Sequence, residues 1–307
     1  MITVIAGGTG SVKLVRGLAA LEKNLAVICN VGDNIWIQGL YVCPDIDTML
    51  YGLANLLDKK RGWGIKNDSF NCLDQLKKTG ASLWFGLGDR DLSTHLIRTS
   101  MIKSGKSLSQ VTDFFRKCYS IPTKLIPATD TEMNTTIATP IMGDMHLQEF
   151  WVKHKGRPRV TGVKFANAVN AKANPAAMDA INQSQAIIIA PANPVSSIGP
   201  TIALPELRRE LVRNRHKVIA ISPLVGATAV SGPAVKYMRA LGLAKSSVGV
   251  ATYYRDFVSK FIISKQDHDL ALQIEALGML VYETNTMMKE KKDEIRLCSH
   301  ILKLVEK

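Results

Sequence analysis

The sequence has no long apolar run, and this absence excludes a membrane-spanning helix. Its cleanest apolar stretch, Ala186–Ala190, has the length of a strand, far short of the roughly 18 residues that a membrane span needs. No basic segment precedes the first apolar residues, Met1–Val4, so we do not expect a secretory signal. We therefore expect a cytoplasmic protein with no membrane partner.

Cysteines are few and isolated. There are 5, and no Cys-x-x-Cys or His-Glu-x-x-His motif occurs. This usage is typical of a reducing compartment and argues against a disulfide framework or a structural zinc site. No Gly-x-Ser-x-Gly turn is present, and no cysteine–histidine pair can be brought together from the sequence, so we do not expect a covalent nucleophile.

Aromatic residues are scarce, and acidic residues are outnumbered by basic ones. Aromatics make up 6% of the chain, and 39 Lys and Arg against 26 Asp and Glu give a net charge of +13. The excess predicts an anionic partner, either a nucleic acid or a phosphorylated small molecule. Because no zinc finger, helix-turn-helix or aromatic RNA motif is present, we expect no nucleic acid. The densest basic groups are Lys59–Arg61, Arg208–Lys217 and Lys289–Lys292; the last is interleaved with acidic residues, which is typical of a solvated helix face.

What the sequence does contain is an alternation of strand and helix patterns. Ile2–Ala6 and Leu25–Cys29 have the pattern of short buried strands, and helical periodicity follows the first of them. The alternation predicts an α/β fold with a doubly wound, mostly parallel, Rossmann-like sheet in one large domain over 1–307.

The segment 124–175 breaks this alternation, and we expect it to form an inserted subdomain that contains β-strands. Within it, Thr135–Ile141 and Met145–Lys153 are expected to be the strands of an antiparallel hairpin. Elsewhere we expect helices over Pro44–Leu57, Asp68–Lys78, Asp91–Lys103, Ser107–Tyr119, Pro205–Arg213, Pro233–Leu241 and after Thr286, and strands over Ala186–Ala190, Val218–Ser222, Phe261–Ser264 and Met279–Glu283.

A glycine-rich turn, Gly7–Gly10, joins the first strand to the first helix. Glycines let the backbone approach a ligand, and free N–H groups at a helix start favour phosphate. We therefore predict phosphate binding at Gly8, Thr9 and Gly10, with Lys13 one turn further on within reach of the same anion; a tight turn without a ligand is the alternative. The spacing matches neither the dinucleotide fingerprint nor the Walker A loop, which argues against a nicotinamide dehydrogenase.

Three aspartates follow or precede predicted elements at the expected ligand edge of the sheet. Asp33 comes after the second strand, together with Asn30, and Asp45 and Asp47 open a helix behind Pro44. A first-turn aspartate can cap a helix or ligate magnesium. Asp45 and Asp47 would point about 200° apart on a formed helix, so we expect one to cap and the other to ligate.

Three further segments carry polar groups at predicted strand or helix ends. Gly88–His95 fits either a capped helix with an Asp–Arg salt bridge or a second wall of a phosphate or metal site. The loops Ala190–Pro200 and Ser222–Ala234 are almost uncharged and follow buried strands, which suits the binding of a nucleotide more than acid–base catalysis.

These motifs together resemble the 2-phospho-L-lactate transferase family of coenzyme F-420 biosynthesis. The resemblance runs nearly end to end. It rests on the segments Gly7–Gly10, Asn30–Trp36, Cys43–Thr48, Arg61–Gly64, Trp84–His95, His146–Trp151, Asn193–Pro200 and Ser222–Ala234.

The resemblance implies a reaction. A guanosine diphosphate ester of lactate or enolpyruvate would give its phospholactyl or phosphoenolpyruvyl unit to the ribityl hydroxyl of the deazaflavin Fo, releasing GMP with the help of Mg²⁺. Relatives suggest a homodimer. A related family of nucleotide-sugar-binding regulators of gluconeogenesis shares the glycine turn and the fold, and is the alternative.

The resemblance also implies roles for residues. Asp47 would face both the metal and Fo, with Asp33 and Asp45 as further metal ligands and Asp45 and Asp47 as catalytic residues; Asp47→Ala is expected to abolish turnover with the fold intact. Gly86 stands where archaeal relatives carry a cation that faces Fo. The expected substrate-binding residues are Gly8, Thr9, Gly10, Lys13, Asn30, Asp47, Gly86, Asn193, Ser197, Gly199 and Gly232.

Overall fold

A parallel sheet runs through the centre of the protein, whose structure is a computed structural model that describes residues 1–81, 83–226, 228–229 and 233–305. Its strand order is β14-β13-β10-β9-β1-β2-β5, and every neighbouring pair is parallel. The predicted fold class is therefore confirmed. The strands are β1 (Ile2–Ala6), β2 (Leu25–Cys29), β5 (Lys124–Pro127), β9 (Ala186–Ile189), β10 (Val218–Ile221), β13 (Lys260–Ser264) and β14 (Leu280–Thr284).

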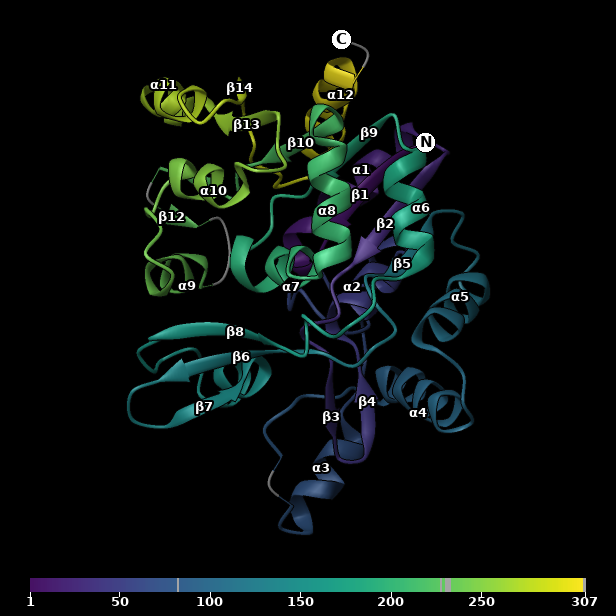
Figure 1. Ribbon diagram of the computed structural model, residues 1–307. Coiled ribbons are helices and arrows are strands. Elements are labelled where there is room, and N and C mark those ends of the chain that lie inside the picture. Colours follow the sequence, from purple (N-terminus) through teal and green to yellow (C-terminus); the bar gives the residue numbers. More distant parts are fainter. Residues whose placement is uncertain (82, 227, 230–232, 306–307) are drawn as a thin grey trace.

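The central strands are apolar throughout because helices cover both faces of the sheet. β1, β2, β9 and β10 are fully buried, as expected of a parallel sheet between two helical layers. Figure 1 shows α6 and α8 side by side in front of these strands, and α1 packs against α2 and α12. The helices are α1 (Gly8–Leu21), α2 (Pro44–Leu53), α3 (Asn71–Lys78), α4 (Asp89–Lys103), α5 (Leu108–Cys118), α6 (Pro175–Gln183), α7 (Gly199–Ile202), α8 (Pro205–Arg213), α9 (Ala234–Ala240), α10 (Ser247–Tyr254), α11 (Ala271–Glu275) and α12 (Lys291–Val305).

The strand order reverses at β1. The chain runs from β1 outward to β2 and β5, then returns to the other side of β1 to form β9, β10, β13 and β14. The turns after β1 and β9 therefore leave the sheet in opposite directions. In open α/β sheets a ligand binds in the crevice that such a reversal opens at the carboxyl ends of the strands.

An antiparallel sheet, β6 (Asn134–Thr139), β7 (Gly143–His146) and β8 (Gly162–Ala166), is inserted after β5 and projects from one end of the molecule (Figure 1). The range 124–175 overstates this sheet, because β5 is the edge strand of the central sheet. The second expected strand is also too long. It ends at His146, and Glu149–Lys153 forms a wide π-type helical turn that buries Phe150 with its ring centroid 5.9 Å from that of Tyr237.

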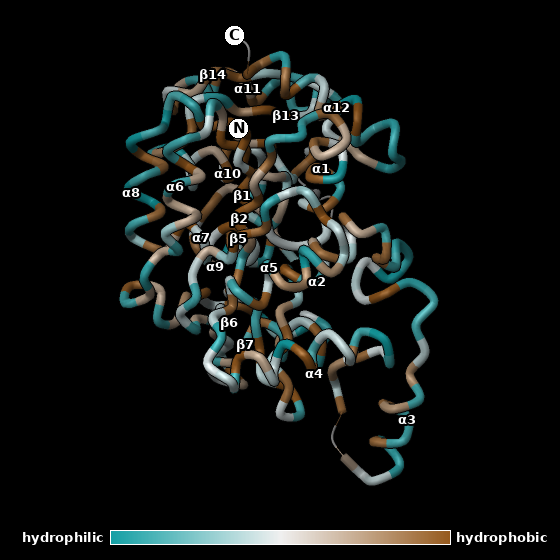
Figure 2. Tube along the Cα trace, turned by 90° about the vertical axis from the view of Figure 1, so that its right-hand side faces the viewer, coloured by the Kyte–Doolittle hydropathy of each residue, from teal (hydrophilic) through white to brown (hydrophobic). Residues whose placement is uncertain are grey.

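Several helix ends differ from the expected ones for local reasons. α2 stops at Leu53 rather than Leu57, and Asn55 then adopts a left-handed conformation, φ +57°. α3 begins at Asn71, not Asp68, and buries none of its residues. Figures 1 and 2 show this mostly hydrophilic helix standing at the end of the molecule away from both termini, while the central strands run hydrophobic through the middle. Short hairpins are formed by β3 (Ile35–Ile37) with β4 (Leu40–Val42), and by β11 (Leu224–Val225) with β12 (Thr228–Ala229).

The helices of the described part of the chain are each too short or too polar to cross a membrane.

Close packing of α1 on α12 depends on Gly17. A Cβ atom at this position would lie 2.6 Å from Cys298 Sγ and 2.7 Å from the Glu294 carbonyl oxygen. We expect Gly17→Ala to lower the free energy of unfolding by about 1–3 kcal/mol, although alanine is the better helix former. Urea unfolding checks this, with Ala20→Ser on the exposed face of α1 as the control. A Gly17→Ala protein as stable as the wild type would contradict the packing.

Candidate active site

A cavity of about 450 Å³ lies at the strand-order reversal. Its walls come from the turns after β1, β2 and β9, from the first turns of α2 and α4, and from the segments 61–64 and 147–152. The lining residues are Gly8, Thr9, Gly10, Asp33, Val42, Pro44, Asp45, Asp47, Thr48, Tyr51, Arg61, Gly62, Trp63, Gly64, Phe85, Gly86, Asp91, His95, Leu147, Gln148, Trp151, Val152, Ala192, Asn193, Ser196, Ser197, Pro233 and Tyr237.

The glycine turn is pressed against the turn after β9. A Cβ atom on Gly7 would lie 2.5 Å from the Ser197 carbonyl oxygen, and one on Gly10 would lie 2.6 Å from the Pro191 carbonyl oxygen. Gly8 has a left-handed φ of +70°. No side chain caps α1 in the manner of an N-cap residue. The Gly8 amide donates to Asp45, and the amides of Thr9 and Gly10, which line the cavity, have no intrahelical partner.

Asp33 and Asp45 form a buried pair of carboxylates. The Asn30 side-chain amide donates to Asp33 Oδ1 at 3.1 Å and to Asp45 Oδ2 at 2.8 Å. Burial and the neighbouring Asp45 charge raise the pKa of Asp33 well above its usual range, and burial raises the pKa of Asp45 to about 6, against hydrogen bonds from Asn30 and the Gly8 amide. Asp45 does not cap α2, whose N-cap is Cys43. Its carboxylate instead faces the glycine turn.

Asp47 has a different environment, since it is neutralised by a buried arginine. Arg98 Nη2 contacts Asp47 Oδ1, and Nη1 donates to Oδ2 at 3.0 Å. Both side chains are almost fully buried, at 1% and 7% exposed. Removing this carboxylate would leave a buried guanidinium unpaired, so we expect Asp47→Ala to cost stability; the expectation that the variant loses turnover with its fold intact stays a prediction.

The polar cluster at the start of α4 packs against this ion pair. Tyr51 donates its hydroxyl to Asp91 Oδ1 at 2.6 Å, and His95 Nε2 lies 3.3 Å from the same oxygen. Arg98 Nη1 is 3.1 Å from His95 Nδ1. Because a guanidinium can only donate, His95 Nδ1 is the acceptor in this contact.

Within Gly88–His95 no side chain acts as the N-cap and no Asp–Arg salt bridge forms; the cap of α4 comes instead from Asp68, which accepts from the Arg90 and Asp91 amides at 2.8 and 3.0 Å. The N-cap of α4 is Gly88, which offers no side-chain bond. Arg90 donates to the Lys66 carbonyl, and Asp89 accepts from Ser69, Asn71 and Cys72. Asp91 and His95 line the cavity, and the second interpretation, a wall that binds phosphate or metal, stays a prediction.

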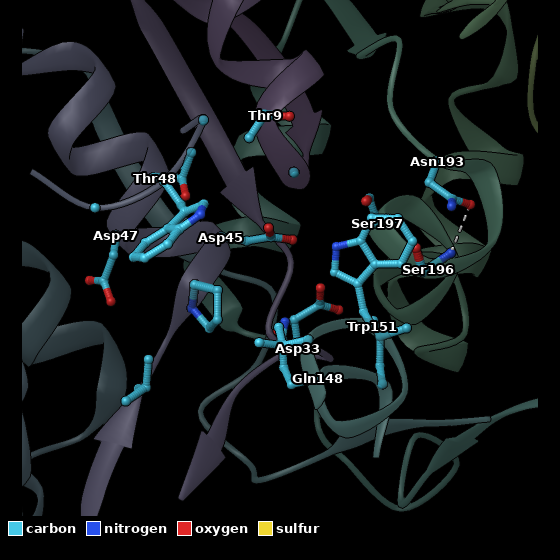
Figure 3. A pocket seen from close by; sticks show the side chains of 18 of the residues that line it. Thr9, Asp33, Asp45, Asp47, Thr48, Gln148, Trp151, Asn193, Ser196 and Ser197 are labelled. Atoms are coloured by element: carbon cyan, nitrogen blue, oxygen red, sulfur yellow. Dashed lines mark hydrogen bonds between the residues drawn. The ribbon is translucent and has the colours of Figure 1, made fainter. Parts of the chain in front are cut away.

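On the opposite wall, two buried polar atoms have no hydrogen-bond partner among the described residues. Asn193 Oδ1 accepts from the Val195 and Ser196 amides at 3.0 and 3.2 Å, which turns Asn193 Nδ2 toward the cavity with no hydrogen bond. The Tyr237 hydroxyl is likewise unpaired, and burial raises the pKa of Tyr237 so that it stays a donor. Figure 3 shows Asn193, Ser196, Ser197 and Trp151 on one side, Asp33 and Asp45 in the middle, and Asp47 and Thr48 on the other side.

Some expected site residues lie elsewhere. Lys13 Nζ donates to the Met288 carbonyl at 2.8 Å and does not line the cavity. Gly199 faces the antiparallel sheet, because a Cβ atom there would meet the Phe165 ring at 2.6 Å. Asn30 does not line the cavity; its side-chain amide donates to Asp33 and Asp45, which do. Gly232 lies outside the described residues.

Other lining residues were not expected from the sequence. Arg61 belongs to a dense basic group and to a motif of the family resemblance that carried no assigned role, although the glycines at 62 and 64 signal a sharp loop there. Arg98 carried no signal, because nothing local to α4 points to Asp47. Tyr237 and Tyr51 lie among apolar residues of predicted helices, a pattern typical of core residues. Gln148 and Trp151 belong to a motif of the family resemblance that carried no assigned role.

The comparisons with known proteins find relatives that match almost the whole chain. The family model described as "2-phospho-L-lactate transferase CofD" matches residues 2–297. The chain is 38% identical to a 2-phospho-L-lactate transferase of Methanosarcina mazei, over 95% of this chain and 97% of the relative. It is 34% identical to a phosphoenolpyruvate transferase of Streptomyces coelicolor, over 99% and 98%.

A solved structure shares the fold. A UPF0052-family protein from Bacillus halodurans superposes with a TM-score of 0.67 at 14% identity, over 98% of both chains. At this identity the likeness concerns the α/β architecture alone.

The ion pair between Asp47 and Arg98 predicts strong coupling between the two positions. We expect Arg98→Met to lower the free energy of unfolding by about 3–5 kcal/mol, because it leaves a buried carboxylate unpaired. Adding Asp47→Asn should restore part of that loss, since the buried charge is then gone. Urea unfolding of the two single variants and the double variant measures the coupling, and strictly additive losses would contradict the pair.

The raised pKa of Asp45 predicts a site that destabilises the metal-free protein. The pKa of Asp45 is about 6 in the folded state, against an ordinary value of 3.8. The contribution of the protonated Asp45 carboxyl to folding stability is therefore complete below pH 3.8 and is lost as the pH rises through 6. In the presence of a chelator, Asp45→Asn should therefore raise the stability at pH 7.5, by about 1–3 kcal/mol. At pH 4 it should change little. Thermal unfolding checks this, with the exposed Asp269→Asn as control, and a destabilised variant at pH 7.5 would contradict the strained carboxylate pair.

Proposed function

The chain belongs to the 2-phospho-L-lactate transferase CofD family, whose members are transferases of coenzyme F-420 biosynthesis, and on this basis we propose a specific reaction. A phospholactyl or phosphoenolpyruvyl unit passes from its guanosine diphosphate ester to the ribityl hydroxyl of the deazaflavin Fo, and GMP is released. The observation that carries the proposal is the meeting of the glycine turn, the Asp33–Asp45 pair and the unpaired Asn193 amide at the strand-order reversal.

The glycine-turn side of the cavity suits the donor. The N–H groups at the start of α1 lie beside Thr9 and can donate to phosphate oxygens. Asn193 Nδ2 and the Tyr237 hydroxyl are buried donors without partners, and such groups cost stability unless a ligand or water satisfies them. We assign them, with Ser197, to the nucleotide part of the donor.

The residues of the site fit Mg²⁺. Among the described residues no group of three or more His, Cys, Asp or Glu side chains could hold a metal ion, but magnesium needs only one or two carboxylates when phosphate oxygens complete its shell. Asp33 and Asp45 are the carboxylates that would hold it, because their charges lie together with no cationic side chain between them, whereas Asp47 already pairs with Arg98. When bound, the cation would neutralise the diphosphate as GMP leaves.

The other side of the cavity suits the acceptor. Trp63 and Phe85 present aromatic faces to the cavity, and Trp63 is 41% exposed, as suits a planar ring system that stacks on binding. A Cβ atom on Gly86 would lie 2.9 Å from Trp63 Cη2, so the glycine lets the edge of this ring approach the backbone. Asp47, fixed by Arg98, would accept a hydrogen bond from the ribityl hydroxyl.

The chemistry then depends on positioning and charge. The hydroxyl oxygen attacks the phosphorus that carries the acid, the bond from that phosphorus to the bridging oxygen breaks, and the bridging oxygen leaves with GMP. Most analyses give such transfers a loose transition state, so the hydroxyl needs orientation more than early loss of its proton. A carboxylate already paired with arginine meets that need, and the proton of the hydroxyl passes to water after bond formation.

Turnover of defined substrates tests the proposal. With Fo, Mg²⁺ and the GDP ester of either lactate or enolpyruvate, we expect GMP release and a product that mass spectrometry identifies. Asp45→Asn should lower kcat by at least about 100-fold, while Asp269→Asn, outside the cavity, should not change it. If neither ester yields GMP with the wild-type protein, the proposed reaction is wrong.

A further inference from the structure

A single cationic side chain lines the cavity in the described part of the chain. Four aspartates and Arg61 are the only Asp, Glu, Lys or Arg residues among the lining residues. Lys13, the other basic residue near the glycine turn, is turned toward the Met288 carbonyl. Any fixed positive charge that the protein offers to an anionic substrate in this cavity therefore comes from Arg61.

Arg61 is held in place before any substrate arrives. Its Nε donates to Asp58 Oδ2 at 3.0 Å and its Nη2 donates to the Ile65 carbonyl at 2.9 Å. The backbone N–H of Arg61 also donates to Asp58 Oδ1, at 3.1 Å, and the loop closes through hydrogen bonds between the backbones of Asp58, Gly62 and Gly64. Gly62 and Gly64 both have left-handed φ angles, +79° and +68°, which favour glycine.

The guanidinium lies over two neighbouring aromatic rings, whose centroids are 6.4 Å apart, and keeps one end free. Its central carbon is 5.1 Å from the centroid of the Trp63 ring and 4.9 Å from that of the Phe70 ring. Its Nη1 makes no hydrogen bond to any described residue, and the side chain is 27% exposed. A planar cation that is stacked and tethered on one edge is preorganised to bind an oxyanion with the other.

The loop that carries Arg61 bridges the two sides of the cavity. At one end, a Cβ atom on Gly62 would lie 3.4 Å from Thr9 of the glycine turn, and at the other, one on Gly64 would lie 3.7 Å from Asp91 Oδ2. Arg61 therefore lines the cavity from a loop that lies next to the glycine turn on one side and to Asp91 on the other. In the proposed reaction, this is where the acid attached to the terminal phosphorus would lie.

We propose that Arg61 is a specificity-determining residue that binds the carboxylate of the acid being transferred. The inference rests on the proposed function. Both lactate and enolpyruvate carry this carboxylate beside the phosphate ester. Arg61 therefore selects for a 2-oxy acid but does not distinguish lactate from enolpyruvate, which has an additional double bond. Hydrogen bonds to charged groups are stronger and more directional than neutral ones, and a neutral analogue would leave the guanidinium edge unpaired.

Binding of three ligands tests Arg61. The ligands are the GDP ester of lactate, the matching ester of lactamide, and GDP itself, and their Kd values are measured by calorimetry with Mg²⁺ and without Fo. The wild type should bind the carboxylate ester about 10–100-fold more tightly than the carboxamide ester. Arg61→Gln should reduce that ratio to below about threefold and leave the Kd for GDP nearly unchanged; Arg61→Lys should keep an intermediate ratio.

Arg208→Gln is the matched control. Arg208 also pairs with an aspartate, Asp256, at 2.6 Å and lies 5.3 Å from an aromatic ring centroid, that of Phe257, but it does not line the cavity. Its replacement should preserve the carboxylate preference. Unfolding temperatures of both variants identify any general loss of structure.

The outcomes separate the two proposals. The role of Arg61 would be overturned by an unchanged preference for the carboxylate ester in Arg61→Gln or by an equal loss of affinity for all three ligands. It would also be overturned if the wild type bound neither ester. Release of GMP from the lactate ester in the presence of Fo tests the proposed reaction separately. The preference for the carboxylate ester can be lost in Arg61→Gln whether or not the wild type turns over.

Discussion

The close approach of two backbone turns at the strand-order reversal is the constraint from which the site follows. Gly7 and Gly10 lie against the carbonyl groups of Ser197 and Pro191 with no room for a side chain. This contact joins the β1–α1 turn to the β9 turn, and Asn30 adds the turn after β2 by bonding both Asp33 and Asp45. Phosphate-binding amides, paired carboxylates and the Asn193 amide are thereby held by three parallel strands whose positions the core fixes.

Charge divides the site into two parts with different roles. Asp47 is compensated by Arg98 inside the protein, so its geometry is fixed and its charge is already balanced. Asp33 and Asp45 share only an amide, and each is disfavoured as a charged group by burial. A pair that strains the empty protein gains most from a ligand that neutralises it, which is a common trade of stability for function. The assignment of the metal to Asp33 and Asp45 follows from this difference.

Much of the central sheet can be predicted from local sequence patterns. Ile2–Ala6 and Leu25–Cys29 occur as predicted, since short apolar runs between turn residues leave few alternatives. Met145–Lys153 was misjudged because Phe150 is buried by Tyr237, a contact that no local pattern contains. Placing Asp33, Asp45 and the glycine turn at one edge was likewise possible from strand order, whereas the pairing of Asp47 with Arg98 depends on how α4 packs across α2.

The net charge of the chain and the charge of its cavity have opposite signs, and this narrows how an anion can bind. The formal charge is +13, yet the cavity is lined by four aspartates and one arginine. Surface lysines raise the potential around the molecule and assist encounter over distances near the Debye length, about 8–10 Å. They cannot neutralise a diphosphate within the cavity. A bound anion therefore needs charge inside it, and the chain provides for that in two places: a carboxylate pair suited to a divalent cation near the glycine turn, and one tethered guanidinium where the loop 61–64 crosses to the acceptor side. An uncharged substrate would need neither, so this arrangement itself favours a donor with anionic groups at both positions.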